Sequence, residues 1–491
     1  MPLLDSSYEW KAHAKKVFLR EKSVDLTGAQ LFEKLNRTVG ILRRFDVKTL
    51  LICGRNSTGW LLFYLAAKKL QISTIIVSPD FSGKKLKQII ANTGCDAAFF
   101  GDITIKPESE HAVEVVFDVG LSTHKFLSFK ETKVKLPHQD VDVLYTSGTT
   151  GAPKGVMVPI ESSVNTANVL IHELGMHAEH SELLSMPFYH SFGLARLRAS
   201  VMACCTLVVS DGLRNAPKVI SEILAGHING LGLVPTGLEL FKQLSKSKAA
   251  EIGSRVEYLE IGSSSMSHEL RVWLKKYFVN TRILHHYGMT EASRSFFVPR
   301  GAKDDFEKPD TVGYAAPNVE YEIRNRLGSG EGELFLRGPN LALGYLGDRQ
   351  LTKEKFREGW FATGDLVIES GNSLKLIGRT DSTINVGGEK ISALEVESVI
   401  EQLEGVECAT CFPIEDRILG FRLAVIVQLI SSTDSDLNKV RLEITKAFVN
   451  PFFKLTASRI SFVENIPKTP NGKKTRIIQE IRTAFDQGFR I

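Results

Sequence analysis

Residues 145–156 read Tyr145-Thr-Ser-Gly-Thr-Thr-Gly-Ala-Pro-Lys-Gly-Val156 and follow the apolar run 141–145. The run predicts a strand, and the stretch rich in glycine and hydroxyl groups predicts a flexible loop behind it. Glycines let backbone N–H groups turn toward an anion, hydroxyls add donors, and Lys154 supplies a full positive charge. The stretch therefore predicts a loop that grips a polyphosphate.

The Walker-type phosphate loop, G-x-x-x-x-G-K-[ST], does not fit this stretch. Pro153 stands where that motif has a glycine before the lysine, and Gly155 stands where it has Ser or Thr after the lysine. A solvent-exposed turn is the plain alternative for a loop of this composition. Twelve consecutive residues with a lysine behind a strand favour phosphate binding over that alternative.

Five further motifs follow this loop in order along the chain. They are PFYHSFG at 187–193, YGMTE at 287–291, WFATGD at 360–365, GRTDSTINVGGEKISALEVE at 378–397 and PKTPNGKKTR at 467–476. Together with the loop they resemble the adenylate-forming (ANL) superfamily of acyl- and aryl-CoA synthetases, peptide-synthetase adenylation domains and luciferases. The resemblance spans about residues 25–480 and implies that a carboxylic acid is activated with ATP to acyl-AMP.

The resemblance implies an ATP site assembled from several of these motifs. Glu291 would bind Mg²⁺, which prefers hard oxygen ligands, and Thr290 would touch the α-phosphate. Asp365 would accept the ribose hydroxyls, and Arg379 would reach the same sugar. The residues implied to hold the phosphates and the adenine are Thr146, Ser147, Gly148, Thr149, Thr150, Gly151, Lys154, His286, Tyr287 and Gly288.

The same resemblance assigns roles to the C-terminal part of the chain. Lys473 would bridge the carboxylate and the α-phosphate; a solvated lysine in a basic tail is the alternative for it. Asp381 would be the hinge of a small domain that rotates between two half-reactions. Gly387 and Gly388 would line the tunnel through which a thiol reaches the acyl-adenylate, because glycines permit close backbone approach of a ligand.

The acid pocket is implied to lie beside the second motif, with His190 as its gate. The residues expected to line it are His190, Phe192, Gly232, Gly262, Ser263, Ser264 and Met289. Relatives that take α-amino acids carry an aspartate in this neighbourhood, but residues 187–196 contain no acid. A buried ammonium without a counter-charge is costly, so we expect a fatty, aryl or β-functionalised acid.

Three outcomes stay open for the complete reaction. The acyl-adenylate passes either to coenzyme A or to the phosphopantetheine thiol of a carrier protein, which would act in trans because no carrier domain is fused. A nucleotide-binding member without catalytic activity is the third alternative. Lys154, Glu291, Asp365, Arg379 and Lys473 are all present, so the motifs themselves favour an enzyme.

Composition fits a globular protein of ordinary character. A chain of 491 residues is too long for a single hydrophobic core, so we expect more than one globular unit. Hydrophobic residues make up 43% and charged residues 24%. The net charge of +5 gives no reason to expect nucleic-acid binding. We expect no membrane span, no signal peptide, and a cytoplasmic location in keeping with six cysteines. The Cys408-x-x-Cys411 pair lies in an apolar run and predicts a buried strand rather than a metal or redox site.

Short apolar runs alternate with helical patterns, which predicts β-α-β units and a parallel sheet. We expect strands at 49–53, 72–77, 96–100, 206–209 and 230–234 and helices at 56–70, 80–93, 164–174 and 216–225. A small β subdomain with a hairpin at 371–372 should follow, then a helix at 393–401 and a strand at 423–428. The expected fold is α/β, and the resemblance implies its division: an N-terminal adenylation core, 1–380, of parallel α/β sheets plus a small β subdomain, and a mobile α+β C-terminal domain, 381–491.

Overall fold

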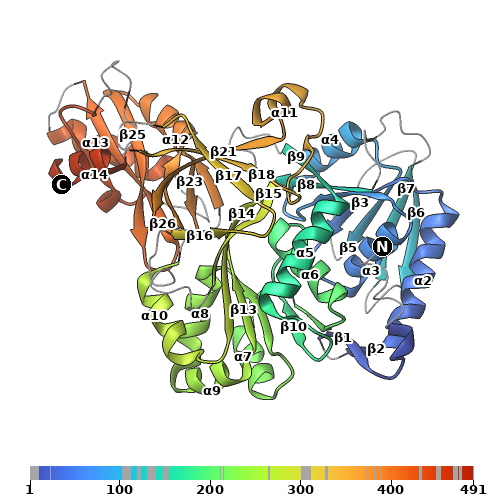
Figure 1. The fold of residues 1–491 in the computed structure, drawn as a ribbon. Coiled ribbons are helices and arrows are strands. Elements are labelled where there is room, and N and C mark those ends of the chain that lie inside the picture. The colour runs from blue at the N-terminus through green and yellow to red at the C-terminus, as the bar shows by residue number, and fades with distance from the viewer. Residues whose placement is uncertain are drawn as a thin grey trace.

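The computed structural model describes residues 10–489 except 23, 102–111, 119–122, 130–135, 137–139, 147–153, 211, 214, 264–265, 300–310, 327–329, 372, 381–382, 388, 431–433, 449–454, 468–473 and 475–477. Two large sheets form most of the molecule, and a smaller unit at the C-terminal end stands apart from them (Figure 1). The mixed α/β architecture expected from the sequence is confirmed.

The first of the two sheets, the distal sheet, has eight strands. Their order is β19 (Gly344–Tyr345), β9 (Lys154–Pro159), β8 (Val141–Thr146), β4 (Ser73–Val77), β3 (Thr49–Gly54), β5 (Ala97–Gly101), β7 (Thr123–Phe129) and β6 (Ala112–Asp118). Strands β5, β3, β4 and β8 run parallel, as the β-α-β pattern predicts. Strand β8 ends where the phosphate-loop motif begins, and β9 starts at Lys154, which closes that motif.

The second sheet, the main sheet, has fourteen strands. Their order is β17 (Glu320–Arg324), β18 (Gly332–Arg337), β21 (Trp360–Ser370), β22 (Ser373–Arg379), β16 (Thr311–Ala315), β15 (Ala292–Pro299), β14 (Arg282–Met289), β13 (Tyr258–Ile261), β12 (Gly230–Leu233), β10 (Ser181–Leu184), β11 (Thr206–Val209), β1 (Val17–Glu21) and β2 (Val24–Thr27), with β20 (Phe356–Arg357) beside β21. In this order, the neighbouring strands β14, β13, β12, β10 and β11 are parallel. The strands β15, β16, β22, β21 and β18 are antiparallel to their neighbours, and β21 and β22 form the predicted hairpin.

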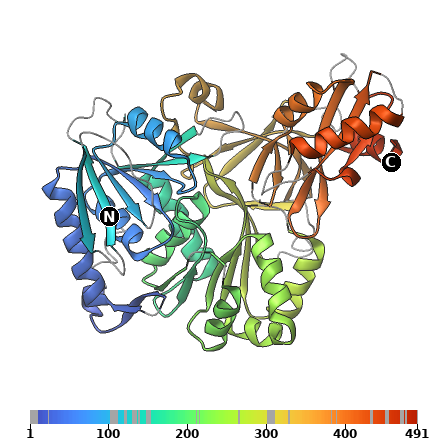
Figure 2. The same cartoon turned by 180° about the vertical axis from the view of Figure 1, so that it is seen from behind.

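Helices cover both sheets and fill the space between them. They are α2 (Gly28–Arg44), α3 (Thr58–Lys69), α4 (Gly83–Thr93), α5 (Ile160–Leu174), α6 (Ser191–Met202), α7 (Ala216–Leu224), α8 (Pro235–Ser245), α9 (Ala249–Arg255), α10 (His268–Tyr277) and α11 (Arg349–Lys355). Helices α5 and α6 lie between the sheets in both views (Figures 1 and 2). None of the helices in the described ranges is long and apolar enough to cross a membrane.

Helix α6 is buried on all sides because it contacts both sheets. Every residue from Phe192 to Val201 is buried, which is the pattern of a helix inside a core. Its two arginines point in opposite directions: Arg196 pairs with Glu182 of β10, whereas Arg198 pairs with Asp142 of β8. The helix therefore joins the two sheets by charge as well as by apolar packing.

The C-terminal unit has its own sheets and its own core. It consists of β23 (Thr383–Val386), β24 (Glu389–Ser392), α12 (Ala393–Glu401), β25 (Val406–Asp416), β26 (Gly420–Leu429), α13 (Asp434–Ala447), β27 (Ile460–Phe462) and α14 (Ile478–Gln487). Residues from Ile384 onward form two apolar clusters of their own. Cys411 is buried in β25 and Cys408 partly so, and neither forms a disulfide, which confirms the buried-strand prediction.

A buried charge cluster fixes β8, the strand that leads into the phosphate loop. Lys68 of α3 is fully buried and its Nζ lies 2.9 Å from Asp142 Oδ1 and 3.0 Å from Asp140 Oδ1. Tyr64 donates a hydrogen bond of 2.9 Å to Asp142, and Arg198 pairs with the same carboxylate. Burial would raise the pKa of Asp142, but Lys68 and Arg198 outweigh it and lower the pKa to about 2.

We predict that Asp142→Asn lowers the free energy of unfolding by about 3–5 kcal/mol, because two buried cations lose their shared counter-charge. In the parent, the depressed pKa of Asp142 contributes stability that is complete above pH ~4 and is lost as the pH falls toward 2, an effect of about 2 kcal/mol. Urea unfolding followed by tryptophan fluorescence at several pH values measures both effects. The control, Asp25→Asn, removes an exposed carboxylate and should stay within about 0.5 kcal/mol of the parent; equal losses in the two variants would contradict the prediction.

Candidate active site

The motifs from the sequence converge at one edge of the main sheet. Strands β10, β12, β13 and β14 are parallel, so their carboxyl ends meet at the same edge, which is where open α/β sheets bind ligands. The segments that follow these ends are 185–190, 234–236, 262–263 and 290–291. Three of these segments overlap a motif or the expected acid pocket, and the fourth, 234–236, follows Gly232 of that pocket by two residues.

On the nucleotide side, three motifs meet at the buried carboxylate of Asp365. Arg379 Nη1 lies 2.5 Å from Asp365 Oδ1, and the hydroxyl of Tyr287 donates to Oδ2. Pairing of β21 with β22 sets Asp365 opposite Arg379, and Tyr287 reaches them from β14. Burial and the neighbouring Asp365 carboxylate raise the pKa of Tyr287, which keeps its hydroxyl a donor. Tyr287, expected beside the adenine, and Arg379, expected beside the ribose, therefore both contact Asp365, the residue expected to accept the ribose hydroxyls.

The proposed magnesium ligand is held by a residue that sequence reasoning missed. The hydroxyl of Tyr345 donates a 2.9 Å hydrogen bond to Glu291 Oε1. Tyr345 lies in β19, which pairs with β9 directly after Lys154. A carboxylate oriented beside the phosphate-loop strand fits a hard divalent cation. Thr290 and Met289, its neighbours, are half-buried at the end of β14. Tyr345 is 54 positions from Glu291 in the sequence, so no local pattern indicated this contact.

On the acid side, Asn56 fixes the loop that contains His190. Its Nδ2 atom donates to the carbonyls of Met186 at 2.8 Å and Ser210 at 3.2 Å, and its Oδ1 accepts from Phe188 N at 2.8 Å. Asn56 follows β3 of the distal sheet, so the loop is attached to both sheets. No motif had indicated this residue, because its role depends on a contact across 132 positions of sequence.

His190 stands immediately before α6 at the rim of the site. Its side chain is exposed to solvent and lies over Tyr189, with ring centroids 4.7 Å apart. Protein atoms around the ring nevertheless lower its pKa through desolvation. Phe192, two residues further, is buried.

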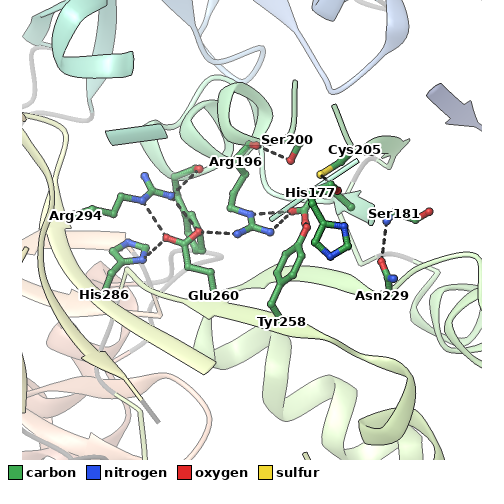
Figure 3. Close-up of polar contacts among 12 residues, drawn as sticks. His177, Ser181, Arg196, Ser200, Cys205, Asn229, Tyr258, Glu260, His286 and Arg294 are labelled. Carbon is green, nitrogen blue, oxygen red and sulfur yellow. Dashed lines mark hydrogen bonds and ion pairs between the residues drawn. The ribbon is translucent and has the colours of Figure 1, made fainter. Parts of the chain in front are cut away.

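Behind the acid side lies a chain of buried charges (Figure 3). Glu260 of β13 receives Arg294 Nε at 3.0 Å and Arg196 Nη1 at 3.1 Å, and Arg196 continues to Glu182. His286 Nδ1 lies 2.8 Å from Glu260 Oε1, although the geometry of this contact does not meet that of a hydrogen bond. Burial would raise the pKa of Glu260, but Arg294 and His286 outweigh it and lower the pKa. The cluster therefore sets two buried carboxylates, Glu260 and Glu182, against the guanidiniums of Arg294 and Arg196.

The expected pocket glycines Gly232 and Gly262, and Gly288 of the expected nucleotide site, are positions where a side chain would not fit. A Cβ on Gly262 would lie 2.0 Å from His286 Cε1, one on Gly232 would lie 2.9 Å from Arg196 Nε, and one on Gly288 would lie 2.5 Å from the backbone N of Arg294. Gly232 and Gly262 therefore border the charged cluster. Ser263, after Gly262, is exposed with φ +78°.

The C-terminal unit contacts this edge of the main sheet at two points. Asn385 Nδ2 donates a 2.6 Å hydrogen bond to the carbonyl of Ser263, and Arg417 pairs with Glu269 of α10 at 2.8 Å. Gly387, at φ +61°, lies against Leu419 and near Thr236 at the start of α8. The hairpin that carries Gly387 thus reaches the acid-pocket loop.

The segment that contains the expected catalytic lysine is attached to the C-terminal unit through its neighbour. Lys474 Nζ lies 2.7 Å from Glu401 and 3.2 Å from Glu397, and it donates 2.9 Å to the carbonyl of Ala409. These carboxylates and hydrogen bonds outweigh burial and raise the pKa of Lys474. Several expected site residues lie outside the described residues, namely Ser147, Gly148, Thr149, Thr150, Gly151, Ser264, Asp381, Gly388 and Lys473; for Thr146 only the backbone strand is described.

A further cluster, of two histidines and a glutamate, has side chains of the kind that bind metal ions. His177, His180 and Glu257 lie close together at the amino ends of β10 and β13, opposite to the active-site edge. His180 Nδ1 accepts from the backbone N of His177 at 3.0 Å, so the proton of its neutral ring resides on Nε2, 2.9 Å from Glu257 Oε2. A donor N–H leaves no lone pair for a metal, and the cluster is a structural hydrogen-bonded one.

Comparison with known proteins agrees with this geometry. The model of the family described as "AMP-binding enzyme" matches residues 8–346. The chain is 26% identical to the 2-succinylbenzoate–CoA ligase of Listeria monocytogenes over 89% of this chain and 88% of that one. It is also 26% identical to the human mitochondrial medium-chain acyl-CoA ligase ACSF2, over 92% and 82% of the two chains.

Among solved structures, the fold is similar to that of a double mutant of o-succinylbenzoate CoA synthetase from Bacillus subtilis bound with its product analogue OSB-NCoA. The TM-score is 0.73 with 20% identity over 98% of both chains. The motif order, the convergence on Asp365 and the match over residues 8–346 lead to one conclusion: the chain belongs to the family of AMP-binding enzymes, the adenylate-forming superfamily that its six motifs resemble.

Proposed function

We propose that this protein activates a carboxylic acid with ATP to acyl-AMP and then transfers the acyl group to the thiol of coenzyme A. The observation that carries the proposal is the meeting of Tyr287, Asp365 and Arg379 from three separate motifs beside the edge where the acid-side residues gather. The named CoA ligases among the relatives support coenzyme A as acceptor. A carrier-protein thiol is the alternative acceptor.

In this proposal, the phosphate loop and Lys154 bind the β- and γ-phosphates. Asp365 has lone pairs beyond those that accept Tyr287 and Arg379, so it can accept ribose hydroxyls. Glu291, oriented by Tyr345, would hold Mg²⁺, which neutralises charge on the phosphates when bound. Preorganised donors and cations of this kind stabilise the charge that develops as pyrophosphate leaves.

We propose that the chain divides near residue 380. Residues 1–380 would bind ATP and the acid, and residues 381–491 would bring Lys473 to the reacting groups and later turn the Gly387-Gly388 loop toward the thiol. Separate sheets and cores after Ile384 support this division. In the arrangement described here, Asn385 contacts the acid-pocket loop, which suits the second half-reaction. A cytoplasmic location stays a prediction.

The decisive experiment measures pyrophosphate release with ATP, Mg²⁺ and a panel of acids, each α-amino acid paired with its des-amino analogue. We expect release with des-amino acids, and at least tenfold lower kcat/KM for the α-amino acids. Glu260 is a buried acid behind the expected pocket glycines, and Arg196, Arg294 and His286 already occupy its carboxylate, so it is not free to pair with an ammonium. Coenzyme A and a phosphopantetheinylated carrier are then compared as acceptors. No release with any acid would indicate a nucleotide-binding protein instead, and faster release with an α-amino acid than with every analogue would overturn the second expectation.

We predict that Lys473→Ala slows adenylation by about 10²- to 10³-fold, because it removes one preorganised charge at the α-phosphate. Thioester formation from supplied acyl-adenylate should change much less, since that step does not need the lysine. Single-turnover pyrophosphate release and acyl transfer from preformed adenylate measure the two steps. The exposed Lys446 of α13 provides the control, Lys446→Ala, which should leave both rates unchanged. Equal losses in both steps for Lys473→Ala would contradict the role.

We predict that Tyr345→Phe raises the Mg²⁺ concentration needed for half-maximal adenylation by about three- to tenfold, because Glu291 loses the hydrogen bond that orients it. At saturating Mg²⁺ most of the activity should return. Titrating Mg²⁺ at fixed ATP tests this. As a control, Tyr321→Phe alters an exposed tyrosine of β17 and should leave the titration unchanged. A loss for Tyr345→Phe that Mg²⁺ does not rescue would show that Tyr345 acts only on the fold.

A further inference from the structure

Arg196 of α6 is held by groups of the main sheet. Its side chain pairs with Glu182 of β10, and its guanidinium lies 5.3 Å from the centre of the Tyr258 ring (Figure 3). The Tyr258 hydroxyl donates a 2.7 Å hydrogen bond to the same Glu182 carboxylate. Glu182 and Tyr258 both lie on strands of the main sheet, so this group fixes α6 on that sheet alone.

Arg198, two residues further along α6, is held by a matching group of the distal sheet. It pairs with Asp142 of β8, and its guanidinium lies 5.6 Å from the centre of the Tyr64 ring. The Tyr64 hydroxyl accepts from Arg198 Nε at 2.7 Å and donates to Asp142 Oδ2 at 2.9 Å. Tyr64 belongs to α3 and is fully buried, so solvent does not replace either hydrogen bond. One hydroxyl therefore joins the central helix to the strand that leads into the phosphate loop.

The carboxylate of Asp142 is held by four donors. Lys68 Nζ lies 2.9 Å from Oδ1, and the hydroxyl of Thr74 donates to the same oxygen. Tyr64 and Arg198 bind Oδ2, so the donors match the roughly four acceptor positions of a carboxylate. A carboxylate that is fully occupied in this way fixes its own strand, β8, relative to α3, β4 and α6.

The pair of Asp142 and Arg198 lies about equally far from the two halves of the proposed site. Asp142 precedes Thr146, the last residue of β8, by four residues, or about 13 Å of strand. The backbone of Thr146 pairs with that of Lys154, the cation of the phosphate loop. Arg198 follows His190 by eight residues, or about 12 Å of helix. A turn of about five degrees at this pair would therefore move the far end of either segment by about 1 Å.

We propose that Tyr64 and Arg198 are positioning residues for adenylation, and that through Asp142 they set the distance between the phosphate-loop strand and the helix that begins after His190. This inference rests on the proposed function. Acyl-adenylate forms when the carboxylate of the acid stands about 3–3.5 Å from the α-phosphate. The acid side belongs to α6 and the main sheet, whereas the phosphate loop belongs to the distal sheet, so this separation depends on the contacts that join them. Neither residue has to touch ATP or the acid for this role.

The test compares Tyr64→Phe with a matched control, Tyr258→Phe. Each variant removes one buried hydroxyl that donates to the carboxylate partner of an α6 arginine. In Tyr64→Phe the Nε–H of Arg198 also loses its acceptor, and a buried donor left unsatisfied is costly, so α6 should shift against β8. We expect single-turnover pyrophosphate release at saturating ATP and acid to slow by about 10- to 100-fold, since a misplacement of about 1 Å costs up to about 10²-fold. Tyr258→Phe should keep the parent rate, because its hydroxyl joins strands of the main sheet only.

Binding is measured separately from the chemical step. Each half of the site stays intact in Tyr64→Phe, so the Kd for ATP without acid and the Kd for the acid without ATP should match those of the parent. Arg198→Lys provides a second variant, because it keeps a positive charge opposite Asp142 but removes the nitrogen that bonds to Tyr64. It should show the same pattern, a slower rate with both Kd values unchanged. Urea unfolding of all variants separates a loss of rate from a loss of stability.

Each outcome of these measurements decides the inference. If the parent releases no pyrophosphate with any acid, the proposed function fails and the inference falls with it. If the parent is active and both Tyr64→Phe and Arg198→Lys react at the parent rate, only the inference fails. A slower reaction that a higher Kd for ATP or for the acid explains, or an equal slowing in Tyr258→Phe, would show a general structural role and would also overturn it.

Discussion

The structure depends on one helix placed between two sheets. Helix α6 is buried on every side, and its arginines reach outward in opposite directions, Arg196 to the main sheet and Arg198 to the distal sheet. A buried arginine is stable only when it is paired and hydrogen-bonded, so each sheet must supply its carboxylate at the right place. Because α6 begins just after His190, this constraint also sets where the acid gate stands relative to the phosphate-loop strand.

Two neighbouring constraints complete the active-site edge. Asn56 joins the His190 loop to both sheets through backbone carbonyls, and Arg294 joins the start of α6 to β13 through Glu260. Asn56 thus holds the backbone of the loop, and Arg294 holds the start of the helix that follows it. Such support from residues behind the contacting ones is what holds a binding geometry within narrow limits.

The sequence was a good guide wherever a local pattern decided the outcome. Strands such as β3 and β4 and helices such as α5 and α7 appear within a few residues of their predicted bounds, because apolar periodicity and turn residues dictate them. Helix α2 was not predicted, although Thr27 and Gln30 form a capping box that marks its start. Asn56, Arg294 and Tyr345 could not be found in this way, since their roles arise from contacts between distant segments. The sequence motifs predicted that Asp365 and Arg379 would serve the same sugar. The adjacent residues His286 and Tyr287 contact different carboxylates, Glu260 and Asp365, because successive side chains of a strand point to opposite faces.

The attachment of Lys474 has a consequence for how the small unit could move. All three partners of Lys474, namely Glu397, Glu401 and Ala409, belong to the same unit as the lysine. A turn of that unit as a rigid body would therefore carry the lysine segment along without breaking any of these bonds. Two side-chain links that such a turn must break are Asn385 to Ser263 and the exposed pair Arg417 with Glu269. Exposed ion pairs are weak, so the Arg417 pair would resist reorientation far less than the internal bonds of Lys474 resist unfolding of the unit itself.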